Sequence, residues 1–190
     1  MKLHELTENM KGRNFSVVSI GSGRVKKTPL AGGKITPIEY KKLEFMRANA
    51  PSKLFVPIYE LTDEYVIMQQ VDVAKAATYI NLFANSYFDM VGDDDIRGED
   101  GDLSIDGLGE FIMNQVLSPN STMDWSSCDD IITNHASDPS IRNFKIAYSY
   151  IRHYRKKLAM VHSWPVSVFD IHIDNIGLSP DNAGLMIFDF

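Results

Sequence analysis

A regular pattern of apolar residues between Ile141 and Val161 is the feature that most limits how this chain can fold. Apolar or aromatic side chains recur there at steps of three and four residues: Ile141, Phe144, Tyr148, Ile151, Tyr154, Leu158 and Val161. This spacing places them on one face of an α-helix, and a continuous apolar face has to be buried against other elements. We therefore expect a long helix over 141–161 that packs into the core of a globular domain.

The first third of the chain has the pattern of short β-strands instead. Runs over 15–20 and 24–28 are separated by Gly21-Ser22-Gly23, and runs over 54–59 and 64–69 by Thr62-Asp63. Strand-like runs joined by turn residues predict two hairpins. Between them, Thr36-Pro37 supplies an N-cap and a first-turn proline, so a helix of about three turns is expected there. Its buried stripe is expected to comprise Ile38, Leu43, Phe45 and Met46.

The middle of the chain predicts helices around 73–88 and 107–117. The acidic run 93–102 between them is not interpreted as a calcium loop, because Arg97 and Ser104 stand where an oxygen ligand and a bidentate Glu are needed. A solvated loop is the favoured interpretation. Residues 118–140 are rich in Ser, Asn, Asp and Pro and predict an irregular connection.

The charge and the cysteine content argue against several classes of protein. With 19 Lys and Arg against 25 Asp and Glu, the net charge is −6, so nucleic acid is not expected as a main partner. The single Cys128 permits no disulfide framework, and no apolar run is long enough to span a membrane, so a cytoplasmic location without membrane contact is expected. The basic residues within 141–161 are interpreted as a solvated face, with a docking surface for an acidic partner as the alternative.

The segment 164–190 carries the strongest chemical signal. Asp170 and Asn175 are five residues apart, and Asp189 follows at the end of a short apolar run. Phosphoryl transfer needs such a set, because one carboxylate can orient a hydroxyl nucleophile while an amide oxygen and a second carboxylate hold Mg²⁺. We interpret His172 as a structural hydrogen-bonder and Asp174 as solvent-facing.

The residues Phe169-Asp170-Ile-His172 and Asn175-Ile176 are similar to the catalytic loop of the early-expressed protein kinases of short-tailed coliphages. With Asp189-Phe190 after the next apolar run, the order of elements resembles the wider protein-kinase-like fold. The resemblance implies that Asp170 is the catalytic residue and that Asn175 and Asp189 are the magnesium ligands.

The N-terminal part can be aligned with the same family. Gly12-Arg-Asn-Phe15-Ser16-Val-Val18 resembles the loop that covers the phosphates and the strand after it, which implies nucleotide contacts from Gly12, Ser16 and Val18. Gln69-Gln70-Val71 resembles the hinge, where the backbone of Gln69 and Val71 would meet the edge of adenine.

The segment Val25-Lys26-Lys27 resembles the strand that carries the phosphate-binding lysine. Lys27 is the first choice because it has the strand parity of Val25, and Lys26 replaces it if the register shifts by one residue. Glu39 is the expected ion-pair partner of this lysine and Glu44 the second choice. A charge that blocks pairing at a sheet edge is the alternative interpretation of Lys27.

On this resemblance we expect an α+β, protein-kinase-like bilobal fold. Residues 1–71 would form a small antiparallel β N-lobe with one helix, and 72–190 a mainly helical C-lobe with a catalytic loop at 168–178 and a metal strand at 185–190. The implied function is an ATP- and Mg²⁺-dependent Ser/Thr protein kinase that acts on host proteins during infection.

Two alternatives remain open at this stage. The sequence ends at Phe190, before the residues that usually form the activation segment and the peptide platform. This end motivates a catalytically weak kinase-like module that binds and inhibits a host defence or transcription factor. The Asp-x-His-x-x-Asn loop also suits a small-molecule phosphotransferase.

Overall fold

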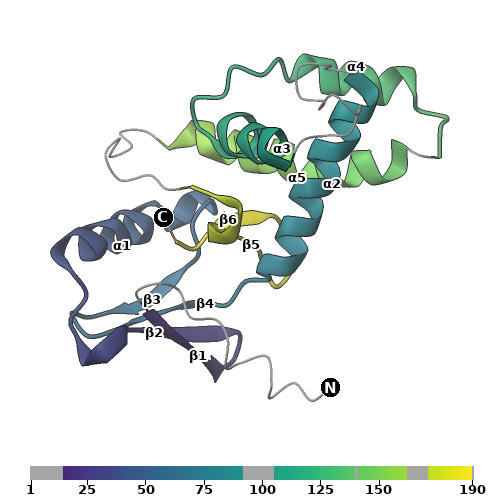
Figure 1. The fold of residues 1–190 in the computed structure, drawn as a ribbon. Helices are drawn as coiled ribbons and strands as arrows, with labels where there is room; N and C mark the ends of the chain where they lie inside the picture. The colour runs from purple at the N-terminus through teal and green to yellow at the C-terminus, as the bar shows by residue number, and fades with distance from the viewer. Residues whose placement is uncertain (1–14, 92–104, 140, 162–170, 190) are drawn as a thin grey trace.

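The computed structural model describes residues 15–91, 105–139, 141–161 and 171–189. They form an α+β structure with a small sheet and one helix at one end and the other helices at the opposite end (Figure 1). The sheet is antiparallel with the order β1-β2-β4-β3. Its strands are β1 (Phe15–Gly21), β2 (Arg24–Pro29), β3 (Ile58–Leu61) and β4 (Val66–Gln69). The helices are α1 (Pro37–Asn49), α2 (Val73–Val91), α3 (Ile105–Phe111), α4 (Ser126–Asn134) and α5 (Ile141–Met160).

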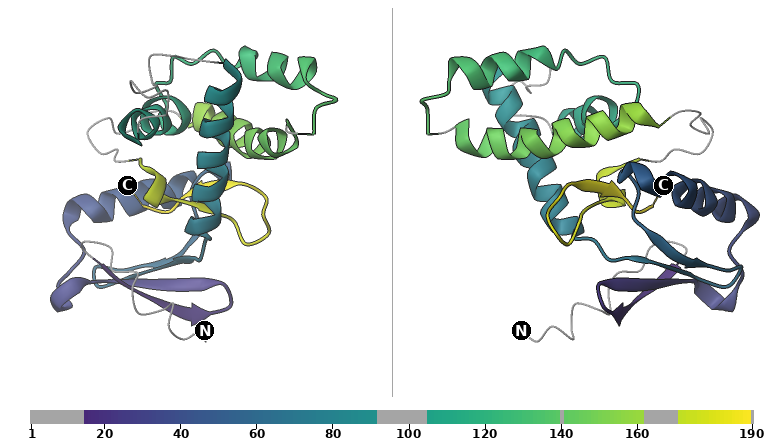
Figure 2. Two further views of the ribbon diagram at one scale, coloured as in Figure 1. Left: turned by 45° about the vertical axis from the view of Figure 1, so that its right-hand side comes forward. Right: turned by 180° about the vertical axis from the view of Figure 1, so that it is seen from behind.

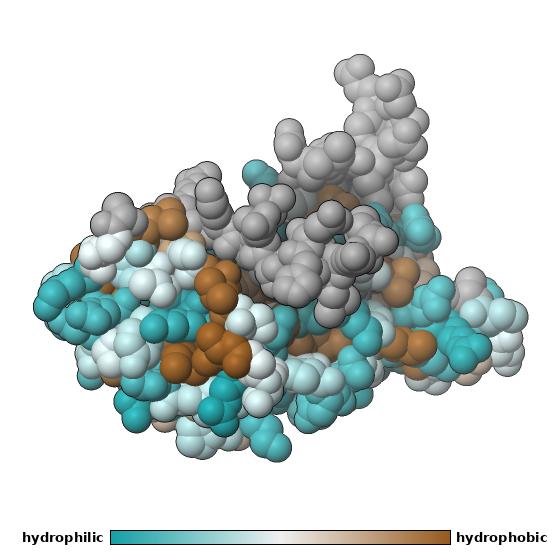
Figure 3. All heavy atoms as spheres, turned by 90° about the horizontal axis from the view of Figure 1, so that it is seen from below, coloured by the Kyte–Doolittle hydropathy of each residue, from teal (hydrophilic) through white to brown (hydrophobic). Residues whose placement is uncertain are grey.

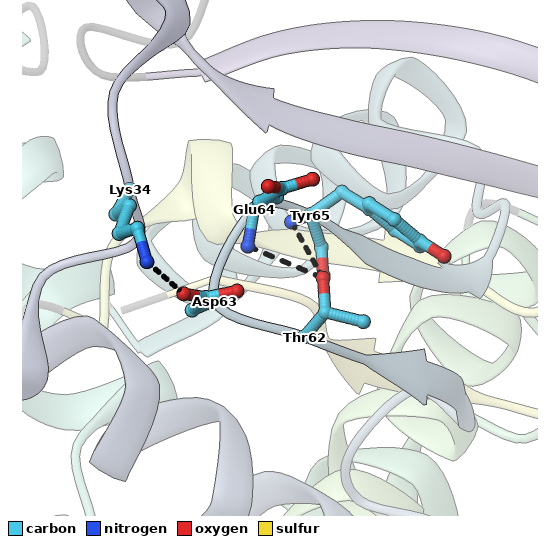
Figure 4. A network of polar contacts seen from close by, with 5 residues as sticks. All are labelled: Lys34, Thr62, Asp63, Glu64 and Tyr65. Atoms are coloured by element: carbon cyan, nitrogen blue, oxygen red, sulfur yellow. Dashed lines mark hydrogen bonds and ion pairs between the residues drawn. The ribbon is translucent and has the colours of Figure 1, made fainter.

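Both predicted hairpins are confirmed. The turn between β1 and β2 holds Gly21, Ser22 and Gly23 at positive φ angles of 83°, 53° and 68°, a conformation that glycine adopts without steric cost. In the turn between β3 and β4, the Thr62 hydroxyl accepts hydrogen bonds from the backbone N–H groups of Glu64 and Tyr65 at 3.2 and 3.1 Å. Figure 4 shows this turn, together with the ion pair that anchors Lys34 to Asp63.

Helix α1 begins where the sequence predicts. Thr36 and Glu39 form a capping box, in which the Glu39 N–H donates to the Thr36 hydroxyl and the Thr36 N–H donates to the Glu39 carboxylate. Leu43 and Met46 are buried as expected, but Ile38 is 67% exposed. Ile38 lies in the first turn of the helix and outside the face that Leu43 and Met46 bury, so its prediction as a core residue is wrong.

The helical end is organised around α5, whose predicted apolar face is buried. The Phe83 ring of α2 stacks on Phe144 and Tyr148 of α5 and on Trp125, with ring centroids 5.6 to 6.0 Å apart. Residues 118–140 were expected to be irregular, yet they contain α4. The sequence pattern does not predict this helix because most of its residues are polar. Its buried residue is Cys128, which is part of the core.

A second, two-stranded sheet lies between the four-stranded sheet and helices α3, α4 and α5, as both views in Figure 2 show. It consists of β5 (Ile176–Leu178) and β6 (Leu185–Ile187), which pair in antiparallel register. A one-turn 3₁₀ helix, Ile173–Asn175, precedes β5. We call β5 and β6 the C-terminal hairpin.

Backbone hydrogen bonds hold the C-terminal hairpin to the N-terminal half of the chain. The Val56 N–H donates to the Ile187 carbonyl at 3.0 Å, and the Ile187 N–H donates to the Leu54 carbonyl at 2.7 Å. On the other strand, Asp72 and Leu178 exchange two backbone hydrogen bonds of 3.0 and 2.9 Å. The hairpin is therefore fixed from both sides, before β3 and after β4.

In the described ranges, no helix is long and apolar enough to cross a membrane. The acidic run 93–102 lies outside the described residues. The helices on either side of it, α2 and α3, are described.

Candidate active site

Lys27 lies on the face of the sheet that the rest of the protein covers. In the antiparallel register, Lys27 is opposite Val17 of β1 and Val66 of β4, and directly opposed residues share one face. Val66 is buried, and the Lys27 side chain is only 7% exposed. A buried lysine needs a partner, because an unpaired charge out of water is strongly disfavoured.

That partner is Asp189, which comes from the far end of the chain. The Lys27 Nζ lies 2.6 Å from the Asp189 Oδ2, while the Asp189 side chain remains 44% exposed. The rings of Phe15 and Phe188 flank the ammonium group at 5.4 and 5.7 Å from their centroids. The carboxylate thus neutralises a buried cation and still reaches solvent.

The C-terminal hairpin brings Asn175 and Asp189 to the same place. Asn175 directly precedes β5, and Phe188 directly follows β6. The Phe188 N–H donates to the Asn175 carbonyl at 3.0 Å, which extends the hairpin pairing by one step. Asn175 therefore lies across the hairpin from Phe188, the residue directly before Asp189, although Asn175 and Asp189 are fourteen positions apart in the sequence.

The alternation of β2 separates the two candidate lysines. Lys26 is opposite Val18 and Ile67, on the other face of the sheet, and its ammonium group lies 3.8 Å from the centroid of the Tyr65 ring. Lys27 alone of the two contacts Asp189. The parity argument therefore selected the lysine that faces the C-terminal hairpin.

Two of the predicted nucleotide contacts, Ser16 and Val18, lie on β1. Ser16 is opposite Thr28, and Val18 is opposite Lys26, so both share the face that points away from Lys27. Val18 is 55% exposed, and apolar groups are visible on the sheet side of the molecule in Figure 3. Val17 is the valine that shares the face of Lys27, and the nucleotide contacts predicted for Ser16 and Val18 stay predictions.

Glu39 and Glu44 of α1 are the acidic residues that were expected to pair with Lys27, and the structure gives them different environments. The Glu39 carboxylate accepts hydrogen bonds from the backbone N–H and the hydroxyl of Thr36 at 3.0 and 2.8 Å. Glu44 is exposed. The carboxylate that the structure places on Lys27 is that of Asp189, and the pairing predicted for Glu39 or Glu44 stays a prediction.

The segment 70–72, which we call the connecting segment, joins β4 to α2 beside this site. The Gln69 N–H donates to Pro57 and the Gln70 N–H to Gly23, at 3.0 and 2.8 Å. No described residue donates to, or accepts from, the backbone of Val71. Of the two predicted hinge residues, Val71 therefore retains both a free donor and a free acceptor among the described residues.

Gly177 fixes how closely the connecting segment approaches β5. A Cβ atom at Gly177 would lie 2.2 Å from the Val71 Cγ2 and 2.5 Å from the Val71 Cβ. Only a residue without a side chain fits this contact. Gly177 was not among the predicted site residues, although a glycine within a short apolar strand is a signal of close approach.

A buried lysine of α5 supports the same hairpin from behind. The Lys157 Nζ donates to the Lys53 carbonyl at 2.9 Å, and Gly184, in the turn between β5 and β6, leaves room for the lysine. Burial lowers the pKa of Lys157, and the nearby Lys53 lowers it further. The sequence analysis missed this bond, since nothing local links residues so far apart along the chain.

Asp189, which contacts Lys27, and Asn175, whose backbone pairs with Phe188, carry donor types that suit a magnesium ion. Asn175 and Asp189 offer an amide oxygen and a carboxylate, and Mg²⁺ takes one or two protein carboxylates and keeps several waters. The described residues contain no cluster of three or more His, Cys, Asp or Glu side chains of the kind that holds a metal without other ligands. Asp170 and Gly12 lie outside the described residues, so their predicted roles stay predictions.

His172 and Asp174 occupy the turn before β5. Asp174 is exposed as expected, and its Oδ2 lies 3.7 Å from the His172 Nδ1. The carboxylate that contacts Lys27 belongs to Asp189, not to Asp174. The pair belongs to the 3₁₀ turn that leads Asn175 into β5.

The sequence and the structure were compared with protein families, curated proteins and solved structures. No family model, curated protein or solved structure matches the chain. The geometry of the site has to carry the functional argument by itself.

Proposed function

We propose that the protein is a phosphotransferase that binds ATP with Mg²⁺ between the inner face of the four-stranded sheet and the C-terminal hairpin. The observation that carries the proposal is the 2.6 Å ion pair between Lys27 and Asp189. It unites a buried cation on a strand with a half-exposed carboxylate at the end of a hairpin. These are the two groups that phosphoryl transfer requires at the phosphates, one for the oxygens and one for the metal.

The sheet supplies a surface for the base. Val17, Val25 and Met68 share the face of Lys27, since Val25 is opposite both Ser19 and Met68 in the register. Val71 follows β4 in the connecting segment. Its backbone N–H and carbonyl make no hydrogen bond to any described residue and can bind a ligand. An adenine on the half-buried Val17 and Val25 could pair with the Val71 backbone and direct its phosphates toward Lys27.

The ion pair has to open when the nucleotide binds. At 2.6 Å, the Lys27 and Asp189 groups are in direct contact and leave no space for a phosphate between them. Because Asp189 is half-exposed and ends the hairpin, it can turn toward a magnesium ion while Lys27 turns to the phosphate oxygens. The charge of each group is then satisfied by the ligand.

Magnesium supplies charge neutralisation on the phosphates when it is bound. Asn175 and Asp189 would hold it, and Asp170 would orient the hydroxyl nucleophile. The acceptor class follows from the resemblance in the catalytic loop, which points to Ser or Thr hydroxyls of host proteins. We adopt this class as part of the proposal.

Transfer of labelled phosphate tests the proposal directly. The full chain is incubated with γ-³²P-ATP, Mg²⁺ and a bacterial protein extract, and protein-bound label is measured. Lys27→Met and Asp170→Asn should each lower incorporation by roughly a hundredfold or more, since removing one group that stabilises transition-state charge has this effect. Lys26→Met is the matched control, because Lys26 lies on the opposite face.

Unchanged incorporation in Lys27→Met or Asp170→Asn would refute the assigned roles. Phosphate transfer to small hydroxyl compounds but not to proteins would move the substrate class to small molecules. A wild-type chain that shows no transfer to either would refute the proposal and leave the binding module as the function to examine.

A further inference from the structure

Helix α5 concentrates positive charge in an otherwise acidic protein. Six of the 19 Lys and Arg residues lie within Ile141–Met160, and this helix contains no Asp or Glu. The chain as a whole has a net charge of −6. A local excess of one sign against the net charge needs an explanation beyond solubility.

Two of the six cations are held by the protein itself. Lys157 is buried and donates to the Lys53 carbonyl, and Arg155 donates to the Ser118 carbonyl while its guanidinium lies 5.2 Å from the centroid of the Trp125 ring. These two residues serve the packing of α5. They leave four cations to account for.

The remaining four cations form a line along one face of α5. We call Arg142, Lys145, Arg152 and Lys156 the cationic stripe. Their spacing of three, seven and four residues keeps them on one helical face, and each is exposed or half-exposed. Only Arg152 has a carboxylate partner among the described residues, since its Nη1 lies 3.3 Å from the Asp129 Oδ1.

A hollow lies beside this stripe, between α4 and α5. It has a volume of about 360 Å³, and its lining includes Lys145, Arg152 and Lys156 from the stripe together with Ile132 and Tyr148. The site of Lys27 and Asp189 shares no residue with this lining. The hollow therefore combines cations with an apolar floor and is separate from the site of Lys27 and Asp189.

We propose that the cationic stripe and the hollow bind an extended acidic segment of a partner protein. From Arg142 to Lys156 the stripe runs for about 21 Å, at 1.5 Å per helical residue. An extended chain advances about 3.3 Å per residue, so about six residues of a partner would match its length. Alternate acidic side chains would meet the cations, while the others pack on Ile132 and Tyr148.

The surroundings favour a polypeptide over a nucleic acid. Asp129 lines the hollow next to Arg152, and its carboxylate repels a continuous phosphate backbone. It can, however, accept hydrogen bonds from the backbone N–H groups of a peptide. A phosphate backbone carries no such N–H donors, so Asp129 favours the peptide. This binding does not depend on the proposed phosphotransfer.

Fluorescence anisotropy with defined peptides tests the proposal. The probe is a labelled peptide with six alternating Glu and Leu residues, and its control has Gln in place of every Glu. The double variant Lys145→Gln, Lys156→Gln removes two stripe cations that make no ion pair within the described residues. The matched control Lys41→Gln, Arg47→Gln removes two exposed cations from α1.

We expect the full chain to bind the acidic peptide and not the Gln peptide, with an affinity that falls as salt rises. The stripe variant should bind about fivefold more weakly, as expected for two solvent-exposed charge contacts, and the α1 variant should bind like the wild type. Equal binding of both peptides, equal losses in both variants, or no binding at millimolar peptide would overturn the proposal. So would tighter binding of a single-stranded oligonucleotide of equal charge.

Discussion

Replacing Gly177 by alanine should strain the contact between β5 and the connecting segment. The new Cβ would lie 2.2 Å from the Val71 Cγ2 and 2.5 Å from the Val71 Cβ, where ordinary contacts begin near 3.4 Å. Rotation about χ1 moves the Cγ2 atom but leaves the Cβ atom in place. Side-chain rotation therefore cannot relieve the clash, and one of the two backbones has to move by about 1 Å.

The backbone shift has a predictable cost. The adjacent hydrogen bonds between Asp72 and Leu178 are 3.0 and 2.9 Å long and would have to lengthen or bend. Overpacking of this kind costs about 1–3 kcal/mol. For a chain of 190 residues, each kcal/mol lowers the melting temperature by about 2–4 °C. We expect Gly177→Ala to lose about 2 kcal/mol, seen as a lower urea midpoint with an unchanged m-value.

A double-mutant cycle separates the clash from other effects. Val71→Ala removes the Cγ2 contact but keeps the Cβ contact, so it should rescue Gly177→Ala only in part, while Val71→Gly should rescue it more fully. Gly109→Ala is the matched control, because Gly109 is an exposed residue of α3 with nothing within 4 Å of an added Cβ. Equal stability of Gly177→Ala and the wild type would refute this account of the connecting segment.

Three further predictions concern residues outside this contact. Thr36→Ala should cost about 1 kcal/mol in urea unfolding, because it removes the capping box that Thr36 forms with Glu39, and stability equal to wild type would contradict this role. Burial raises the pKa of Cys128 to about 12, so the thiol should react with a disulfide reagent at pH 8 only after unfolding; rapid reaction of the native protein would show that it is accessible. Burial lowers the pKa of His153, with Lys157 and Lys156 adding to the shift, so the unfolded state binds the proton more readily and stability should fall as the pH drops below about 6.5. His153→Gln should weaken this dependence in melting curves, and an identical pH profile would refute it.

Much of the local structure follows from the sequence because its causes are local. The three- and four-residue spacing of α5, the turn residues of both hairpins and the Thr36 cap are each contained in a short segment. The choice of Lys27 over Lys26 followed from the same kind of reasoning, since strand alternation needs only the neighbouring Val25. These features could be read without knowing what the elements pack against.

The errors arose where the outcome depends on pairing or packing over distance. Which valine of β1 shares the face of Lys27 could not be told from the sequence, because the register of β1 against β2 is set by the turn and by an irregularity between Ser19 and Gly21. Helix α4 was missed because its residues are mostly polar and its helical state depends on packing against α5. The contact of Asp189 with Lys27 spans nearly the whole chain, so no local pattern could give its geometry.

Binding of Mg-ATP is the measurement that tests the central proposal most directly. Isothermal titration calorimetry on the full chain should show that wild type binds Mg-ATP, that Lys27→Met binds at least tenfold more weakly, and that Lys26→Met binds within about twofold of wild type. The loss in Lys27→Met corresponds to about 1.4 kcal/mol or more, as expected for a lost hydrogen bond to a charged group. Equal affinity of the wild type and Lys27→Met, or no binding of the wild type at millimolar Mg-ATP, would contradict a nucleotide site built on Lys27 and Asp189.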